Sequence, residues 1–287
     1  MVVEIDDRSG FCFGVVNAIT LAEKSLAKGE PIYSLGDIVH NRVEVQRLEK
    51  LGLGTIRHGE LEKLRGSTIL IRAHGEPPAT YRKAEALDIS IVDATCPVVA
   101  LLQKRVAQAY ENMSACNGQV VILGRIGHAE VDGLTGQVEG EITVIEGRGD
   151  LDKLDFDRPI YLLSQTTQSL ALFEEIKREI YARAADGTAV TIEDTICRRV
   201  ANREPHLAQF AARFDVVLFV SGRKSSNGAV LFEICRGANP RCYMIEEEAE
   251  LEGWMLDGAQ SVGICGATST PRWIMERIAE KIKETDK

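Results

Sequence analysis

Residues Ile91-Val-Asp-Ala-Thr-Cys96-Pro97 join a short β-type run directly to a helical pattern. Proline suits the first position of a helix, because the N–H that it lacks would have no partner there. Apolar residues then recur at the spacing of one helical face: Val99, Leu102, Val106, Ala109 and Met113. The stretch therefore predicts a strand that passes through a cysteine into a helix, which is the connection found in βα proteins.

Two other cysteines stand at the same structural point. Cys197 ends the stretch Ile192-Glu-Asp-Thr-Ile-Cys197, in which Asp again precedes Cys by three residues, and this likeness indicates a weak internal repeat. Cys12 precedes an apolar face that Gly29 ends, which predicts another helix. The helix after Cys197 should begin or bend at Pro205. One thiol in each third of the chain can bring three ligands to a shared centre, which would then keep one vacant position.

The cysteines as a set favour metal binding or core burial over disulfides. There are seven of them, an odd number, without the framework of a small secreted protein. A position before a helix favours the thiolate form that metals bind, which supports Cys12, Cys96 and Cys197 as ligands, although each could instead be a small buried side chain. The others lack this context and are expected in the core: Cys116, Cys235, Cys242 and Cys265.

Short β-rich runs alternate with helical periods along the chain, as in stacked βα units with mainly parallel sheets. The predicted fold class is therefore α/β. Strands are predicted at residues 2–5, 32–35, 68–72, 89–92, 120–123, 142–145, 160–163, 190–193, 216–220, 243–245 and 262–265.

Polar residues cluster just after six of these strands. They are His40 and Asn41, His74 and Gly75, His128 to Glu130, Gln165 to Thr167, Ser225 to Asn227, and Ser269 with Thr270. Because ligands of open parallel sheets bind beyond the carboxyl ends of the strands, these loops could share one pocket, and their donors suit an anionic group such as a diphosphate. Taken singly, each residue could equally be a helix cap or a solvated side chain. Glu130 is a candidate proton donor, with a surface salt bridge as the alternative.

The composition excludes several classes of protein. With 287 residues, of which 45% are hydrophobic and 27% charged, the chain has the make-up of a soluble globular protein. A net charge of -9 argues against a nucleic acid or an anionic membrane as partner. No apolar run approaches the roughly 20 residues that cross a bilayer, and the first residues lack the regions of a signal peptide, so we expect a cytoplasmic protein.

Seven short strings resemble the motifs of one enzyme family, the 4-hydroxy-3-methylbut-2-enyl diphosphate reductases. The strings are GFCFGV (10–15), VHNR (39–42), AHGE (73–76), DATCP (93–97), GHAEVDG (127–133), SQTT (164–167) and SSN (225–227). They occur in the order of the family and, with the residues up to Pro271, cover nearly the whole chain. One such string would mean little, whereas seven in order are specific.

The resemblance implies a fold and a set of functional residues. The fold is an α/β protein of three small βα lobes, with mainly parallel sheets in a pseudo-threefold arrangement around a central 4Fe-4S cluster, and we expect the lobes over residues 1–96, 97–194 and 195–287. Cys12, Cys96 and Cys197 are implied as the metal ligands, and Glu130 and Thr166 as catalytic residues. The substrate-binding residues that it implies are His40, His74, His128, Thr166, Ser225, Ser226, Asn227 and Ser269.

The implied reaction removes the hydroxyl group of 4-hydroxy-3-methylbut-2-enyl diphosphate reductively, giving isopentenyl and dimethylallyl diphosphate. A 4Fe-4S cluster normally takes four thiolates, so three would leave one iron open to hold that hydroxyl. Two electrons would come from a small donor protein such as ferredoxin or flavodoxin. Glu130, relayed through Thr166 and the bound diphosphate, would supply the protons.

The chain departs from the family pattern at a few positions. Arg125 stands where many members have a further His, residues 198–204 differ from the usual run, and Gly228 replaces a usual Ser. None of these removes a ligand or the acid, so we expect altered contacts around the centre with the reaction kept.

Two other functions stay open on the sequence. An iron-sulfur dehydratase acting on a small phosphorylated alcohol would use the same open iron and need no reductant. A non-enzymatic iron-sulfur sensor or a diphosphate-binding module would give Glu130 no role. A structural zinc site is disfavoured, because such sites close with four ligands.

Overall fold

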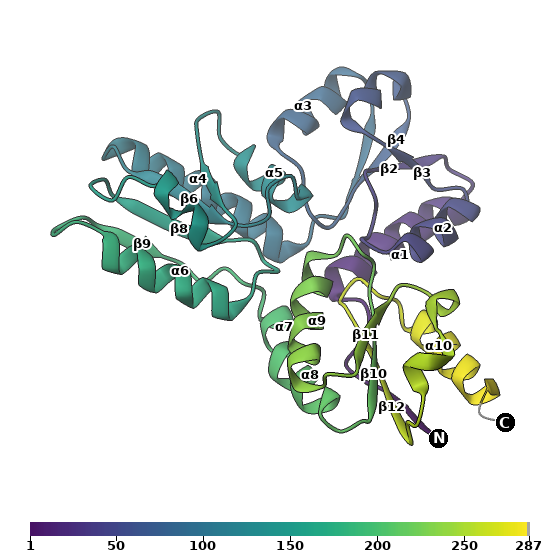
Figure 1. Cartoon of the computed structure of the whole chain (residues 1–287). Coiled ribbons are helices and arrows are strands. Elements are labelled where there is room, and N and C mark those ends of the chain that lie inside the picture. The colour runs from purple at the N-terminus through teal and green to yellow at the C-terminus, as the bar shows by residue number, and fades with distance from the viewer. Residues whose placement is uncertain (286–287) are drawn as a thin grey trace. The chain divides into compact units, whose positions relative to one another are not determined.

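The computed structural model describes residues 1–285, and the strands of this range form three four-stranded sheets (Figure 1). The chain divides into two compact units, one of residues 1–55 with 198–287 and the other of residues 56–197. Every strand pair that is given a register runs parallel. The α/β class and the parallel sheets predicted from the alternating pattern are therefore confirmed.

The first unit contains the sheet with the order β1-β12-β10-β11. Its strands are β1 (Val2–Ile5), β12 (Ser261–Gly266), β10 (Val216–Val220) and β11 (Cys242–Ile245). All five residues of β10 are buried and apolar, which is the pattern of a parallel strand covered on both faces.

Alternate residues of β10 supply two different cores. Val216, Leu218 and Val220 pack with Ile274, Ile278 and Ile282 of α10 (Arg272–Thr285), whose spacing puts them on one helical face. Val217 and Phe219 pack on the other side, with Leu207 and Phe210 of α8 (Arg203–Ala211) and Leu231 of α9 (Ser226–Ala238). The sheet is therefore sandwiched between helices, which removes both of its apolar faces from water.

The first unit has further elements, most of them in its N-terminal segment. They are α1 (Phe13–Ala27), β2 (Ile32–Leu35), α2 (Arg42–Lys50), β3 (Gly54–Ile56, at the border of the units), α7 (Arg198–Ala201) and the 3-10 turns η3 (Glu248–Glu250) and η4 (Gly253–Leu256). The short strand β3 was not predicted, because Gly54-Thr-Ile offers too few apolar residues for a periodic signal.

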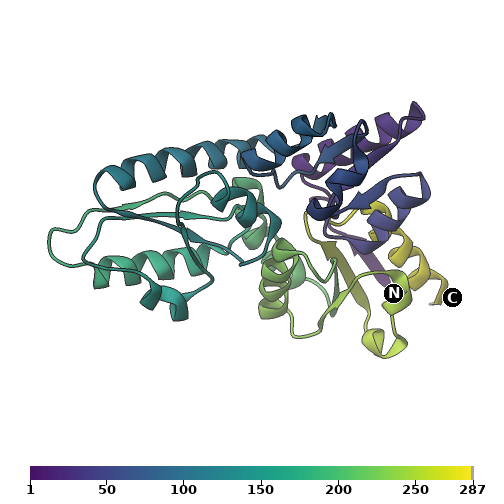
Figure 2. The same cartoon turned by 90° about the horizontal axis from the view of Figure 1, so that it is seen from above.

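The second unit contains the sheet with the order β7-β6-β8-β9. Its strands are β7 (Thr143–Ile145), β6 (Gln119–Leu123), β8 (Ile160–Ser164) and β9 (Val190–Ile192). Helices α4 (Pro97–Ala115) and α6 (Leu170–Arg183) lie on opposite faces of this sheet (Figure 2). The apolar face predicted for α4 is confirmed, since Leu102, Val106 and Ala109 pack on β6.

The second unit also contains the parallel strands β4 (Thr68–Ile71) and β5 (Ser90–Asp93). The remaining elements are η1 (His58–Leu64), α3 (Pro78–Ala86), α5 (Ala129–Thr135) and η2 (Arg148–Lys153). β4 and β5 belong to the sheet that also contains β2 and β3.

Strand β1 belongs to the C-terminal sheet. It pairs with β12, with Val2 opposite Ser261 and Ile5 opposite Ile264. The lobe predicted over residues 1–96 includes this strand, whereas the structure joins it to strands from residues 216–266. An apolar strand pattern suits any parallel neighbour, so alternation along the sequence gives no information about which sheet receives an edge strand. The borders at residues 96 and 194 stay a prediction.

Candidate functional site

Each of the three predicted ligand cysteines follows an edge strand and precedes a helix. Cys12 is the N-cap residue of α1, Cys96 is the N-cap residue of α4, and Cys197 comes directly before α7. The strands before them, β1, β5 and β9, each stand at one end of their sheet. The sequence prediction of a shared structural point is therefore confirmed for all three.

The main chain of each cysteine is tied to the loop after the neighbouring strand. The N–H of Cys12 donates to the carbonyl oxygen of Thr268 at 3.0 Å, that of Cys96 to Ala73 at 3.0 Å, and that of Cys197 to Thr166 at 2.9 Å. Thr268 follows β12, Ala73 follows β4 and Thr166 follows β8, which are the strands paired with β1, β5 and β9. Each sheet thus presents one cysteine beside one of the predicted polar loops.

The likeness between the stretches before Cys96 and Cys197 has a structural basis. Asp93 Oδ1 accepts from the N–H of Thr95 at 2.8 Å, and Asp194 Oδ1 accepts from the N–H of Ile196 at 3.1 Å. An aspartate that binds the main chain two residues further on makes a tight local turn. The two turns deliver their cysteines to the following helices in the same way.

The seven cysteines fall into three classes of exposure. Cys12, Cys96 and Cys197 are partly exposed, so these residues are not enclosed in the apolar cores. Cys235, Cys242 and Cys265 are buried, as predicted. Cys116 is exposed, which corrects the expectation of core burial, because it caps the C-terminal end of α4 where that helix leaves the sheet.

Glu130 lies on α5 in the second unit and is buried, with 2% of its surface exposed. Its Oε1 accepts from the N–H of Thr166 at 2.7 Å, and its Oε2 accepts from the Thr166 hydroxyl at 2.8 Å. Burial raises the pKa of Glu130 above its ordinary value, against the opposing effect of both hydrogen bonds. The alternative of a surface salt bridge is excluded, and a buried carboxyl group with a raised pKa is suited to act as an acid.

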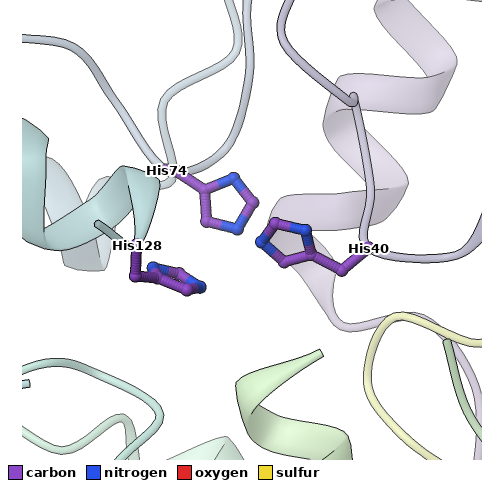
Figure 3. A group of neighbouring side chains, drawn as sticks. All are labelled: His40, His74 and His128. Atoms are coloured by element: carbon purple, nitrogen blue, oxygen red, sulfur yellow. The ribbon is translucent and has the colours of Figure 1, made fainter. Parts of the chain in front are cut away.

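His74 and His128 lie side by side in the second unit. Their ring centroids are 5.3 Å apart and the rings meet edge to face (Figure 3). His128 is the N-cap residue of α5, and its Nδ1 accepts from the N–H of Glu130 at 3.2 Å. His128 therefore positions the main chain of Glu130, while Thr166 holds the carboxyl group. His40, also drawn in Figure 3, comes from the loop after β2 in the first unit.

The predicted serine and asparagine residues gather at the start of α9 in the first unit. Ser225 is the N-cap residue and accepts from the N–H of Gly228, while Ser269 donates to the Ser225 hydroxyl at 3.0 Å. Asn227 Oδ1 accepts from both the N–H and the hydroxyl of Thr268.

Two donors at the start of α9 are left over after these contacts. The Ser226 hydroxyl and the Asn227 Nδ2 are buried and have no hydrogen-bond partner within residues 1–285. Buried donors without a partner are costly, and a helix N-terminus attracts negative charge. The start of α9 therefore has the chemistry of an anion site.

Gly222 is a functional position that the sequence analysis missed. A Cβ atom built on Gly222 would lie 2.9 Å from the carbonyl carbon of His40 and 3.0 Å from the Cα of Asn41, and closer still to the His40 carbonyl oxygen. Only glycine lets the loop before α9 pack directly on the main chain of the His40 loop. A glycine among polar residues was the available signal, but many loops contain one.

The two loops border a cavity of about 320 Å³ in the first unit. Its wall includes His40, Asn41, Arg42, Arg223 and Lys224. The Asn41 side chain caps α2 through Oδ1, and its Nδ2 has no partner within the described residues. The three cations are each near a carboxylate, for example Arg42 with Glu247 at 2.5 Å.

Gln165 was predicted only as part of a polar loop, and the structure gives it a specific role. It is fully buried, its Oε1 accepts from the N–H of Arg125, and its Nε2 donates to the Thr167 hydroxyl. It therefore joins the loop after β6, which carries His128, to the loop after β8, which carries Thr166. Its place within the SQTT string was the only sequence signal.

The departure at Gly228 has a steric explanation. A Cβ atom at this position would lie 3.0 Å from the Cβ of Ser221 and 3.1 Å from that of Ser225, and it would overlap the Ser221 hydroxyl. Ser221 is fully buried and fills the space that a serine at position 228 would need. Arg125 contacts Gln165 through its main chain, so the side chain at this position does not alter that bond.

The fold and site define an α/β protein in which three parallel sheets each bring one cysteine next to a polar loop. Residues 3–283 match the family model described as LytB protein, and the chain belongs to this family. It is 54% identical over 282 residues to a protein of Parabacteroides distasonis named 4-hydroxy-3-methylbut-2-enyl diphosphate reductase, covering 98% of this chain and 97% of that one.

Two solved structures of reductases are also similar to this chain. A structure titled (E)-4-hydroxy-3-methyl-but-2-enyl diphosphate reductase, the terminal enzyme of the non-mevalonate pathway, is 34% identical with a TM-score of 0.71, and the match covers 99% of this chain and all of that one. The E-1-hydroxy-2-methyl-but-2-enyl-4-diphosphate reductase of Plasmodium falciparum is 24% identical with a TM-score of 0.86, over 98% and 88% of the two chains, and shows the shared fold. The predicted family and three-lobed fold are confirmed.

Among residues 1–285, no helix has the length and apolar character to cross a membrane.

Proposed function

We propose that this chain is a 4-hydroxy-3-methylbut-2-enyl diphosphate reductase that converts its substrate into isopentenyl and dimethylallyl diphosphate. The full-length relatives of that name support the reaction. The observation that carries the site is the threefold pairing of a cysteine with a polar loop through one main-chain hydrogen bond. Three separate sheets have no structural need to repeat this contact at their edges.

Cys12, Cys96 and Cys197 would hold a 4Fe-4S cluster. Their donor set fits, because thiolates are the ligands of such clusters, and each of these cysteines is partly exposed and directly precedes a helix. When bound, the cluster supplies two electrons in succession and an iron free to hold the hydroxyl group of the substrate. The buried Cys235, Cys242 and Cys265 are poor alternatives, since they lie inside an apolar core.

The diphosphate group would be held by the residues that the family resemblance implies. They are His40, His74, His128, Thr166, Ser225, Ser226, Asn227 and Ser269. The Ser226 hydroxyl and the Asn227 amide are the strongest support, because a bound phosphate oxygen would satisfy donors that are otherwise orphaned. The N-terminus of α9 adds its partial positive charge.

Glu130 would deliver the proton that turns the hydroxyl group into water. Its raised pKa keeps a larger fraction of the carboxyl protonated than at an exposed glutamate. The Thr166 hydroxyl, in contact with Oε2, can accept one proton and pass on another, so it links the carboxyl to the bound substrate. Hydroxide is a poor leaving group, whereas the protonated hydroxyl group leaves as water.

The electrons would come from a small donor protein such as ferredoxin or flavodoxin, and the reaction would take place in the cytoplasm. The dehydratase alternative needs no reductant, so conversion of the substrate without one would favour it. The sensor alternative predicts substrate binding with no product.

Replacing the cysteines tests the metal centre. After anaerobic reconstitution, Cys12→Ser, Cys96→Ser and Cys197→Ser should each lose most of the visible absorbance and the paramagnetic signal of the cluster, since serine is a poor iron ligand. Cys116→Ser is the matched control, because Cys116 is exposed and lies at the opposite end of α4 from Cys96. Equal loss of the cluster in the Cys116 variant would refute the ligand assignment.

Replacing Glu130 tests the acid. Glu130→Gln keeps the size of the side chain and an acceptor for the Thr166 N–H, so cluster and substrate binding should stay as in the wild type. Turnover should fall by about 10²–10⁴-fold, which is the usual contribution of a general acid. Turnover close to that of the wild type would remove Glu130 from this role.

A further inference from the structure

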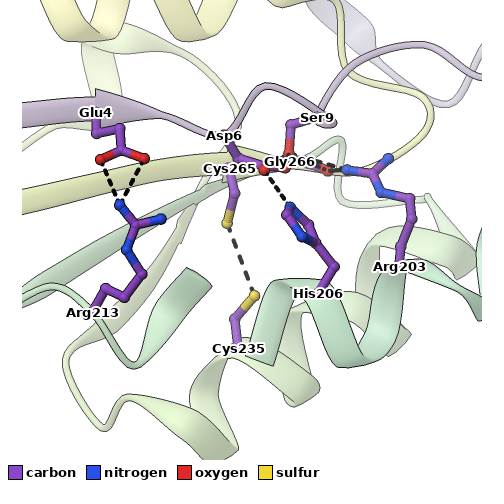
Figure 4. A network of polar contacts seen from close by, with 9 residues as sticks. All are labelled: Glu4, Asp6, Ser9, Arg203, His206, Arg213, Cys235, Cys265 and Gly266. Atoms are coloured by element: carbon purple, nitrogen blue, oxygen red, sulfur yellow. Dashed lines mark hydrogen bonds and ion pairs between the residues drawn. The ribbon is translucent and has the colours of Figure 1, made fainter. Parts of the chain in front are cut away.

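Arg203 is a buried cation whose contacts the proposed reaction does not use. It lies on α8, six residues after Cys197, and only 8% of its surface is exposed. Its guanidinium Nη2 donates to the carbonyl oxygen of Gly266 at 2.7 Å and to the Ser9 hydroxyl at 3.0 Å (Figure 4). Within residues 1–285, its side-chain hydrogen bonds go only to Ser9 and Gly266, and its Nε has no partner.

These two contacts join three segments of the proposed metal site. Gly266 ends β12, two residues before Thr268, whose carbonyl oxygen holds the N–H of Cys12. Ser9 lies three residues before Cys12 and receives the N–H of Gly266. Arg203 therefore connects the segment that follows Cys197 with both strands that position Cys12.

A second layer of contacts fixes the acceptors of Arg203. The Ser9 hydroxyl donates to Asp6 Oδ2 at 2.6 Å, and Asp6 Oδ1 contacts the Nε2 of His206 at 2.6 Å (Figure 4). His206 is one helical turn beyond Arg203 on α8. Helix α8 thus contacts the residues before Cys12 through both Arg203 and His206, and of these two only Arg203 is buried.

The charge of Arg203 is incompletely balanced. Burial lowers the pKa of Arg203, while the nearby Asp6, Cys265 and Cys12 act in the opposite direction. A buried cation is costly unless an anion compensates it, and the one carboxylate in the network is reached only through Ser9. A cluster bound by three thiolates carries negative charge, which increases on reduction.

We propose that Arg203 is a positioning residue for the metal centre, which holds the segment after Cys197 against the strands that position Cys12 and raises the reduction potential of the cluster. The second part rests on the proposed function. The guanidinium fork makes two bonds in a fixed geometry that lysine cannot reproduce, whereas both side chains carry the charge. The two parts of the proposal are therefore separable by substitution.

The positioning part is tested on metal-free protein by hydrogen exchange. Arg203→Met keeps an unbranched apolar side chain about as long as the aliphatic stem of arginine and removes the guanidinium group with both of its bonds. The protection of the Cys12 amide should therefore fall about tenfold or more, the equivalent of one lost hydrogen bond to a charged group. Arg203→Lys should give an intermediate loss. If the Arg203→Met protein folds and keeps wild-type protection at Cys12, the positioning role is refuted.

The charge part is tested by redox titration of reconstituted protein. Arg203→Met should lower the potential by about 59 mV or more, a tenfold change in a one-electron equilibrium, and Arg203→Lys should recover more than half of this shift. Equal potentials in Arg203→Met and the wild type refute the electrostatic role. A wild-type chain that takes up no cluster refutes the charge part and the proposed function together. The hydrogen-exchange experiment uses metal-free protein, so it tests the positioning role independently of both.

Arg213→Met provides the matched control. Arg213 follows α8 and pairs with Glu4 of β1 at 2.8 and 3.0 Å, but the pair is exposed (Figure 4). Exposed ion pairs contribute little, so this variant should keep the wild-type exchange and potential. A potential shift in Arg213→Met as large as that in Arg203→Met would show a general effect of lost charge and would overturn the assignment.

Discussion

Gly222→Ala should disturb the His40 loop more than its size suggests. The added methyl group would meet main-chain atoms of His40 and Asn41 at 3.0 Å or less, and main chain cannot turn aside as a flexible side chain can. Overpacking of this kind costs about 1–3 kcal/mol. The backbone must shift by a few tenths of an ångström or more, and a displacement approaching 1 Å at a positioning group can cost about 10²-fold in rate.

The assay compares Gly222→Ala with Gly237→Ala. Gly237 is exposed in the last turn of α9, and a Cβ atom there would have no neighbour within 4 Å. The control should therefore gain about 0.5–1 kcal/mol from the better helix former. Urea unfolding gives the free energies, and steady-state kinetics give kcat/KM for the substrate.

The expected pattern is a loss of both stability and kcat/KM in Gly222→Ala, with neither loss in the control. A Gly222→Ala protein as stable as the wild type and with wild-type kcat/KM would refute the close packing of the two loops. A loss of stability with unchanged kcat/KM would refute the idea that this packing positions His40.

Three further predictions follow from the described contacts. Because the pKa of Glu130 is raised above 4.5 in the native state, the native protein binds this proton more tightly than the unfolded chain, and stability should fall as pH rises from about 4.5 through the native pKa. Urea midpoints of Glu130→Gln should lack this fall, and parallel pH curves for the two proteins would contradict the argument. Thr166→Val removes a hydrogen bond that lowers the pKa of Glu130, so the loss of turnover at high pH should move to higher pH. Turnover itself should decrease. An unchanged pH profile of turnover would contradict the effect of this contact on Glu130. Asn239→Ala should cost about 2–4 kcal/mol, because the buried amide donates to the carbonyl oxygens of Ala211 and Phe214 and both would be orphaned, whereas a cost near zero would mean that water replaces it.

Much of the fold could be predicted because its strands are apolar and short. All eleven predicted strands exist with bounds within one residue or two, and the faces of α1 and α4 agree closely with the buried residues Ala18, Ile19, Val99 and Leu102. Pro205 is the third residue of α8, after a break from α7 at Asn202, as its restricted backbone requires. These features depend on local pattern, which the sequence expresses directly.

The features that could not be predicted depend on long-range contacts. The pairing of β1 with β12 joins residues about 260 positions apart, and no local pattern specifies it. The close approach of Gly222 to His40 and the Arg203 network are of the same kind. Ser, Thr and Asn residues after the strands were visible in the sequence. It gave no sign that Thr166 would hold Glu130, or that the Ser226 hydroxyl would have no partner within residues 1–285.

The cysteines are anchored by their amides and not by their thiols, which bears on how a metal centre can be acquired. Each anchoring bond joins main-chain atoms only, so its formation requires no ligand on the sulfur. Most of the ordering entropy of the ligand segments is then lost during folding, and little remains to be lost on capture of the inorganic core. We therefore expect a chain of this design to fold before the metal centre is inserted.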